Sequence, residues 1–168
     1  FTWTAGGFSG SGVVHVTGIL NSSSNNGHTI GGSKELRISN VATFTSAPMT
    51  MTGTAKILVL SGGSFIWDGS ATLNIAGSPS NIFEIQTGGI FYKAGIGTLT
   101  FNTVSFFNYG LLKGNGLINF SAFTNAGMVS PGLTTGVLTL NKFSNTNSTL
   151  SIDINGPGIA GTDRDSLK

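Results

Sequence analysis

The chain has 168 residues, a net charge of +2 and only 8% charged residues, about a third of the fraction usual in soluble domains. Apolar residues make up 39% and include twelve phenylalanines, which excludes a disordered chain, and the absence of cysteine excludes disulfides and thiolate metal sites. The eight basic residues are scattered and the longest aliphatic run is Ile57–Leu60, so we expect neither a nucleic-acid surface nor membrane insertion.

The first third of the chain predicts short strands separated by polar turns. In residues 1–20, Val14 and Val16 alternate with His15, the period-2 pattern of a half-buried strand. Residues 21–33 are rich in Asn, Ser and Gly, which predicts a polar loop that protrudes from the fold. Alternation resumes at residues 36–38 and continues to residue 60.

From residue 62 onward, similar segments recur. Gly62–Trp67 and Gly88–Lys93 lie 26 positions apart, and Asn108-Tyr109-Gly110-Leu111 is followed 17 positions later by Asn125-Ala126-Gly127-Met128. Because Asn and Gly tolerate positive φ, we interpret each as a sharp bend between strands. The predicted structural turns are Asn108, Gly110, Asn125, Gly127, Gly63 and Gly89. The intervals between these four glycines shorten steadily along the chain.

A bend that recurs at a drifting interval favours a right-handed, single-stranded parallel β-helix of all-β class, whose turns can lengthen without disturbing the stacked strands. We expect seven or eight coils of irregular length, a rod of roughly 35–40 Å, and no substantial helix. Apolar side chains should form inward columns, and the Asn108 and Asn125 amides should stack. Residues 1–168 are predicted to form one β-helix segment, a fragment of a longer chain, because Phe1–Thr4 already resembles mid-strand sequence.

The C-terminal third resembles a known family. Residues 126–132, 136–140, 150–156 and 161–167 are similar to the β-helical repeats of bacterial secreted surface proteins. These include autotransporter passenger domains and adhesin-like proteins of Bacteroidetes, although that family commonly has an aromatic residue where Arg164 stands. The resemblance implies a scaffold on the cell surface, with no shared catalytic residues. We therefore expect a protein that is not an enzyme and has no cofactor.

The ionisable residues offer few candidates for a catalytic or metal-binding site. A carbohydrate-active β-helix would need convergent acids, and Asp68 and Glu84 are the pair that stacking could bring together, although separate structural roles are favoured. Asp163 and Asp165 are the best candidates for binding a metal, but an ordinary Asx-turn is favoured there over a metal site. His15 and His28 are too few for a zinc site.

Exposed side chains suggest two kinds of binding surface. Trp3, Trp67, Tyr92 and Tyr109 are candidates for stacking on sugars, unless they cap the core. Thr-x-Thr pairs such as Thr50/Thr52 raise the possibility of ice binding, but their irregular spacing argues against a flat threonine array.

The sequence thus predicts a structural or adhesive extracellular protein: a stalk, a surface adhesin segment or a filament subunit that stacks end to end. The expected partners are a second copy, or the remainder of a longer chain, at the open β-helix ends. Surface glycans are a further candidate partner. The alternative is a carbohydrate-binding or carbohydrate-active β-helix protein.

Overall fold

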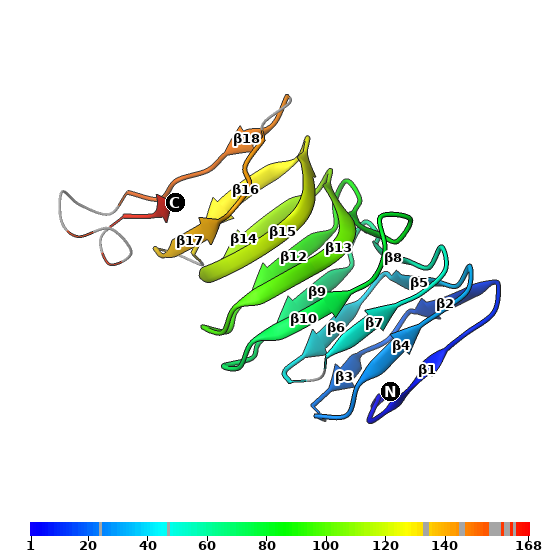
Figure 1. Cartoon of the computed structure of the whole chain (residues 1–168). Coiled ribbons are helices and arrows are strands. Elements are labelled where there is room, and N and C mark those ends of the chain that lie inside the picture. Colours follow the sequence, from blue (N-terminus) through cyan, green and yellow to red (C-terminus); the bar gives the residue numbers. More distant parts are fainter. Residues whose placement is uncertain are drawn as a thin grey trace.

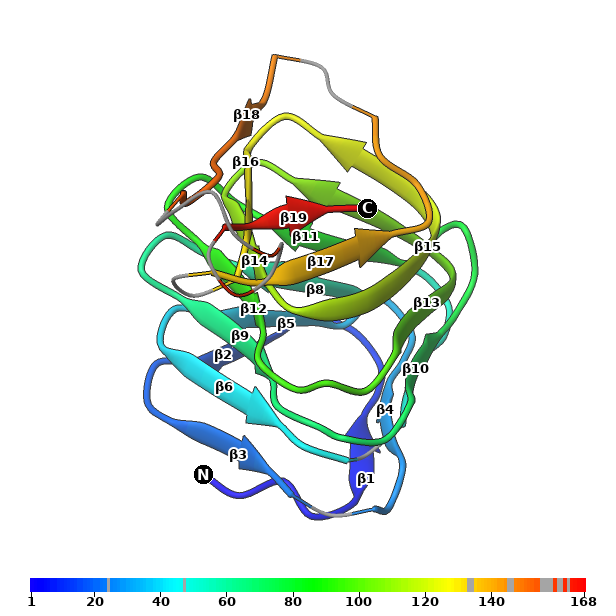
Figure 2. The same ribbon diagram turned by 90° about the vertical axis from the view of Figure 1, so that its left-hand side faces the viewer.

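The computed structural model describes residues 1–23, 25–46, 48–132, 135–144, 147–154, 159, 162 and 164–168. These residues form nineteen β-strands and no helix, so none of them belongs to a helix that could span a bilayer. The strands wind as a right-handed parallel β-helix, as predicted from the sequence (Figure 1). Seen from the C-terminal end, the winding encloses a single core between three faces (Figure 2).

Each face is a ladder of parallel strands from successive coils. The first face contains β1 (Gly6–Phe8), β4 (His28–Ile30), β7 (Met49–Met51), β10 (Leu73–Ala76), the first halves of β13 (Leu99–Asn108) and β15 (Gly116–Asn125), β17 (Val137–Leu140) and β19 (Ser166–Leu167). The second face contains β2 (Val13–Val16), β5 (Glu35–Ile38), β8 (Lys56–Val59), β11 (Ile82–Ile85) and the second halves of β13 and β15. The third face contains β3 (Leu20–Ser22), β6 (Val41–Phe44), β9 (Ser64–Trp67), β12 (Ile90–Lys93), β14 (Leu111–Gly114), β16 (Met128–Pro131) and β18 (Thr149–Leu150).

The described residues make six three-strand turns, fewer than the seven or eight expected. Beyond β16, strands β17, β18 and β19 continue the first and third faces, but no described strand follows on the second face. Coil length varies as predicted: on the third face Ser64 pairs with Ile90, Ile90 with Leu111, and Leu111 with Met128. These steps shorten in the same way as the glycine intervals, because the corners absorb the difference in length.

Phenylalanine columns fill the core, as the alternating pattern predicted. Phe65 stacks between Phe44 and Phe91, with ring centroids 4.7 and 5.3 Å away. Phe83 stacks on Phe106 at 5.1 Å in a second column. Because stacked strands place equivalent side chains one above another, each coil buries its apolar face only against its neighbours.

The prediction of a protruding loop at residues 21–33 is wrong. This range contains the end of β3 and the whole of β4, and His28 pairs in register with Gly6 on one side and Met49 on the other. Composition was misleading because two polar side chains, Ser22 and His28, point inward and hydrogen-bond to each other.

The bend glycines lie where predicted, but for another reason. Positive φ occurs at Gly62 and Gly88, which come directly before the predicted turn residues Gly63 and Gly89. It does not occur at Gly110 or Gly127. A Cβ atom on Gly110 would lie 2.4 Å from the Gly89 carbonyl oxygen, and one on Gly127 would lie 2.3 Å from the Gly110 oxygen. These glycines are therefore required by the close approach of successive coils.

Candidate functional site

The N-terminal end of the β-helix leaves core positions uncovered. Among the described strands, β1 pairs only with β4, and β2 only with β5, so each has a free backbone edge. The outer edge of β3 is partly covered, because Thr2 bridges to Asn21 and the Trp3 amide donates to the Asn21 carbonyl at 2.9 Å. At this end the edges of β1 and β2 are therefore more open to another strand than the edge of β3.

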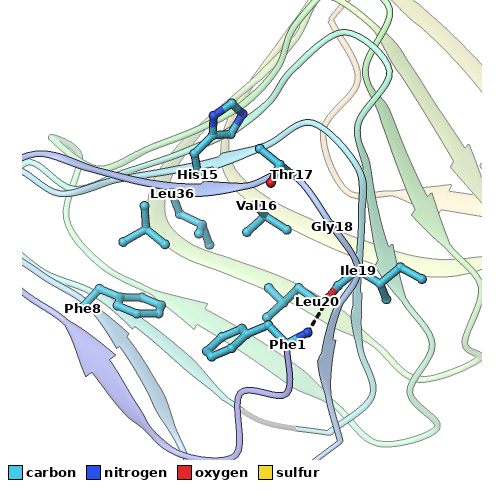
Figure 3. Close-up of a pocket in the computed structure, with 10 residues that line it drawn as sticks. Phe1, Phe8, His15, Val16, Thr17, Gly18, Ile19, Leu20 and Leu36 are labelled. Carbon is cyan, nitrogen blue, oxygen red and sulfur yellow. Dashed lines mark hydrogen bonds between the residues drawn. The ribbon is translucent and has the colours of Figure 1, made fainter.

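A cavity of about 380 Å³ opens at this end (Figure 3). It is lined by Phe1, Phe8, Val14, His15, Val16, Thr17, Gly18, Ile19, Leu20 and Leu36. On the second face, Val14 begins the inward column that continues through Leu36 and Ile57. Leu36 and Ile57 are buried, whereas Val14 is partly exposed because no described strand lies over it. The cavity thus lies at a core position that no described strand covers.

A buried polar pair that sequence analysis missed joins β3 to β4. Ser22 Oγ and His28 Nε2 are 2.5 Å apart, and both side chains are fully buried. The Trp3 indole stacks on the His28 ring at 4.1 Å, and burial lowers the His28 pKa. Within the described residues, His28 Nδ1 has no hydrogen-bond partner, so the pair lacks the acid that would orient a catalytic triad.

A second missed feature is the buried Lys93. Its side chain points inward from β12 beside Phe91, and its Nζ donates to the Gly95 carbonyl at 2.5 Å. Burial lowers its pKa to about 8. The sequence alternation could have predicted this burial. Since side chains alternate along a strand, an inward Phe91 and an outward Tyr92 place Lys93 inward.

The structure removes two of the four sugar-stacking candidates. Trp67 is wholly buried beside Phe65 on β9, and Trp3 is 4% exposed. Both are therefore core residues. Alternation along β9 turns Trp67 inward, and stacking on His28 holds Trp3 inward. Tyr92 faces outward under Lys113, whose Nζ lies 5.2 Å from its ring centroid, and burial with the nearby Asp68 charge raises the Tyr92 pKa.

Tyr109 is the most accessible of the four. Its side chain is 42% exposed and its ring lies parallel to that of Phe107, with centroids 6.4 Å apart. It lines a shallow groove of about 550 Å³ that also contains Leu111 and Met128.

The acidic candidates do not converge. Asp68 follows β9 on the third face, whereas Glu84 points outward from β11 on the second face and accepts from Gln86 at 3.1 Å. Asp163 lies outside the described residues, while Asp165 is 5% exposed and accepts from the Asp153 amide at 2.9 Å. No cluster of three metal-ligating side chains occurs in the described part of the chain.

Histidine and threonine are equally dispersed. His15 lies on the outer side of β2 and hydrogen-bonds Ser39, away from the buried His28. Thr50 pairs in register with Thr29, but its other neighbour is Ala76, so the threonine ladder stops after two rungs. The arrangement does not produce the extended array that ice binding needs.

The asparagine ladder is present as predicted. Asn108 Nδ2 donates to Asn125 Oδ1 at 2.7 Å and to the Met128 carbonyl at 3.0 Å, and both asparagines are buried. The two residues pair in register at the ends of β13 and β15. The ladder ties two consecutive corners together.

Replacing Asn108 with alanine should lower the free energy of unfolding by about 2 kcal/mol, because the buried Asn125 Oδ1 and the partly buried Met128 carbonyl lose their donor. Chemical denaturation monitored by circular dichroism measures this loss. The control is Asn102→Ala on the outer side of β13, where the side chain is exposed and little change is expected. Equal effects at both positions would contradict a stabilising ladder.

Comparison with known proteins gave no match: no family model, no curated protein and no solved structure is significantly similar to this chain.

Proposed function

We propose that the chain is a structural and adhesive segment of a bacterial cell-surface protein, a stalk, adhesin or filament subunit whose β-helix stacks end to end with a second copy. The observation that carries this proposal is the N-terminal end, where two free strand edges surround an uncovered apolar cavity. The cell-surface location rests on the resemblance of the C-terminal third to bacterial surface repeats.

Backbone direction favours head-to-tail stacking. Every described coil-to-coil strand pair on the three faces is parallel, so the free edges of β1 and β2 suit strands that run in the same direction. At the other end, the second half of β15 lacks a described partner on its C-terminal side, and Leu150 and Ile154 are 41% and 72% exposed. Within the described residues, both ends therefore offer strand edges and apolar side chains.

The rod itself needs no chemistry to perform this role. Backbone ladders run along all three faces, and the phenylalanine columns continue from coil to coil. Such a rod transmits force along its axis through many hydrogen bonds at once. Stacking at the ends would extend the same ladder from one copy into the next.

The test uses a matched pair of substitutions on β2. Val14→Glu places a carboxylate in the cavity, whereas His15→Glu places one on the outer side of the same strand. We expect the wild-type chain to form a series of concentration-dependent species in analytical ultracentrifugation and rods in negative-stain images. Val14→Glu should raise the protein concentration needed for association at least about tenfold, because association would bury an unpaired charge. His15→Glu should leave this concentration unchanged.

The distribution of species separates the alternatives. Head-to-tail contacts give an open series, whereas contacts between two N-terminal ends stop at dimers. Dimers alone would contradict head-to-tail stacking, and a monomer at every concentration would contradict self-association. In the second case polysaccharide binding becomes the leading candidate, with the exposed Tyr109 as the first residue to replace.

A further inference from the structure

We propose that Ser22 and His28 form an acid-sensitive latch that holds the first coil, residues 3–22, against the rest of the β-helix. When His28 gains a proton, this coil opens and the N-terminal end loses its shape. A second part of the proposal rests on the proposed function: opening of the coil abolishes end-to-end stacking.

The geometry of the pair joins two coils. Ser22 ends β3 in the first coil, and His28 begins β4 in the second. Besides the 2.5 Å hydrogen bond between them, the Trp3 indole from the first coil stacks on the His28 ring at an angle of 19°. Phe8 lies 4.8 Å from Trp3 and lines the N-terminal cavity. The contact between His28 and Trp3 therefore supports one wall of the cavity.

The surroundings of His28 suit a neutral ring only. Its register partners are Gly6 and Met49, and Phe44 lies at its edge, 6.4 Å away. A protonated ring donates from both nitrogens, but Nδ1 faces no acceptor in the part of the chain that the structure describes. An imidazolium here would be a buried charge with a single hydrogen bond.

Among the residues that the structure describes, no nearby charge compensates for that proton. The sequence has no acidic residue before Glu35, which points outward from β5 and pairs with Arg37. The other charged or titratable groups of the first coil are His15, on the outer side of β2, and the N-terminal ammonium, which donates to the exposed Ile19 carbonyl. The face of Trp3 attracts a cation weakly, but burial still lowers the His28 pKa below its usual value.

The sign of the pH effect follows from this shift. A histidine with a lowered folded-state pKa contributes its full stability above the unfolded value of 6.5, and this contribution is lost as pH falls below it. The first coil responds before the others because β1 and β2 pair on one side only. Local opening at the N-terminal end is therefore the expected first event on acidification.

The protein's two tryptophans provide the readout. Trp3 reports on the first coil and Trp67 on the middle of the core, and their indole N–H signals can be assigned in two-dimensional NMR with Trp3→Phe. Between pH 8 and pH 5, we expect the Trp3 signal to broaden or vanish while the Trp67 signal persists. Hydrogen-exchange protection of residues 6–22, corrected for intrinsic rates, should fall at least about tenfold.

Matched histidine variants identify the group responsible. His28→Gln keeps a hydrogen-bonding side chain that does not titrate, so its Trp3 signal should not change between pH 8 and pH 5. His15→Gln, on the outer side of β2, should respond like the wild type. If His28→Gln does not fold, the His28 ring signals in the wild type decide: their midpoint must coincide with that of Trp3. A Trp3 signal that is constant with pH, or a midpoint apart from that of His28, would overturn the latch.

Ultracentrifugation at pH 7.5 and pH 5 tests the second part. Loss of association at pH 5 in the wild type, but not in His28→Gln, is the expected result. Association that persists at pH 5 while Trp3 responds would overturn the link to stacking. A monomer at both pH values would contradict the proposed function, and the latch would then stand or fall on the Trp3 signal.

Discussion

Replacing Phe106 with alanine is expected to lower the free energy of unfolding by about 4 kcal/mol, the largest loss we expect from any single truncation in this chain. The side chain is 1% exposed and lies at the junction of the phenylalanine columns. Its ring centroid lies between 4.7 Å and 5.7 Å from those of five others: Phe83, Phe91, Phe101, Phe120 and Phe123. A cavity at this point would remove contacts in three consecutive coils, and stacked backbone ladders restrict the collapse that could fill it.

Phe107→Ala is the matched control, because it removes the same side chain one position further along β13. Phe107 points outward, is partly exposed, and contacts Tyr109. Its truncation should cost less than about 1 kcal/mol. Urea denaturation followed by circular dichroism measures both variants. Similar losses for the two variants would contradict the inward and outward assignment of β13.

The repeat and its alternation were enough to predict the architecture. The interval between Gly110 and Gly127 equals the step from Leu111 to Met128, because the residue after each glycine starts the equivalent strand. The length of a coil can therefore be read from the spacing of these glycines in the sequence. The asparagine ladder was predictable for the same reason, since Asn108 and Asn125 hold the same place in successive coils.

The predictions that failed concern polar residues whose partners come from another coil. Residues 21–33 have the composition of a loop, but Ser22 and His28 form a hydrogen bond with each other in the core. Their contact depends on the path between β3 and β4, which composition does not encode. The sequence left Trp3 open between a sugar-stacking and a core position, because its stack on His28 depends on the same packing.

Lys93 was missed for a different reason: the alternation of β12 predicts an inward side chain, but a charged residue is not expected at an inward position. Alternation places the side chain inward in register with Trp67, although a lysine is almost never fully buried without a partner. On the other side it pairs in register with Gly114. A Cβ atom on Gly116 would lie 2.8 Å from Lys93 Nζ, so the missing side chain at Gly116 leaves room for the lysine.

We expect Lys93→Met to stabilise the protein at pH 7 by about 2 kcal/mol. Removing the buried charge stabilises the folded chain, and losing the hydrogen bond to Gly95 offsets part of that gain. Burial lowers the Lys93 pKa from 10.5 to about 8. At pH 7 the lysine is charged in both the folded and the unfolded chain, and the folded chain bears a penalty of up to about 3 kcal/mol. Methionine fills similar volume without charge, but the Gly95 carbonyl loses its donor at a cost of about 1 kcal/mol.

The dependence on pH makes this prediction distinctive. Between pH 8 and pH 10.5 the unfolded chain binds more protons than the folded one, so wild-type stability rises with pH relative to the methionine variant. The advantage of Lys93→Met should therefore shrink, pass through zero at about pH 10 and reverse by about 1 kcal/mol at higher pH. Lys113→Met, on the outer side of β14, is the control and should change stability at pH 7 by less than about 0.5 kcal/mol. A stability difference between wild type and Lys93→Met that stays constant from pH 7 to pH 11 would mean that Lys93 is not a buried charge, because only its titration links this position to pH.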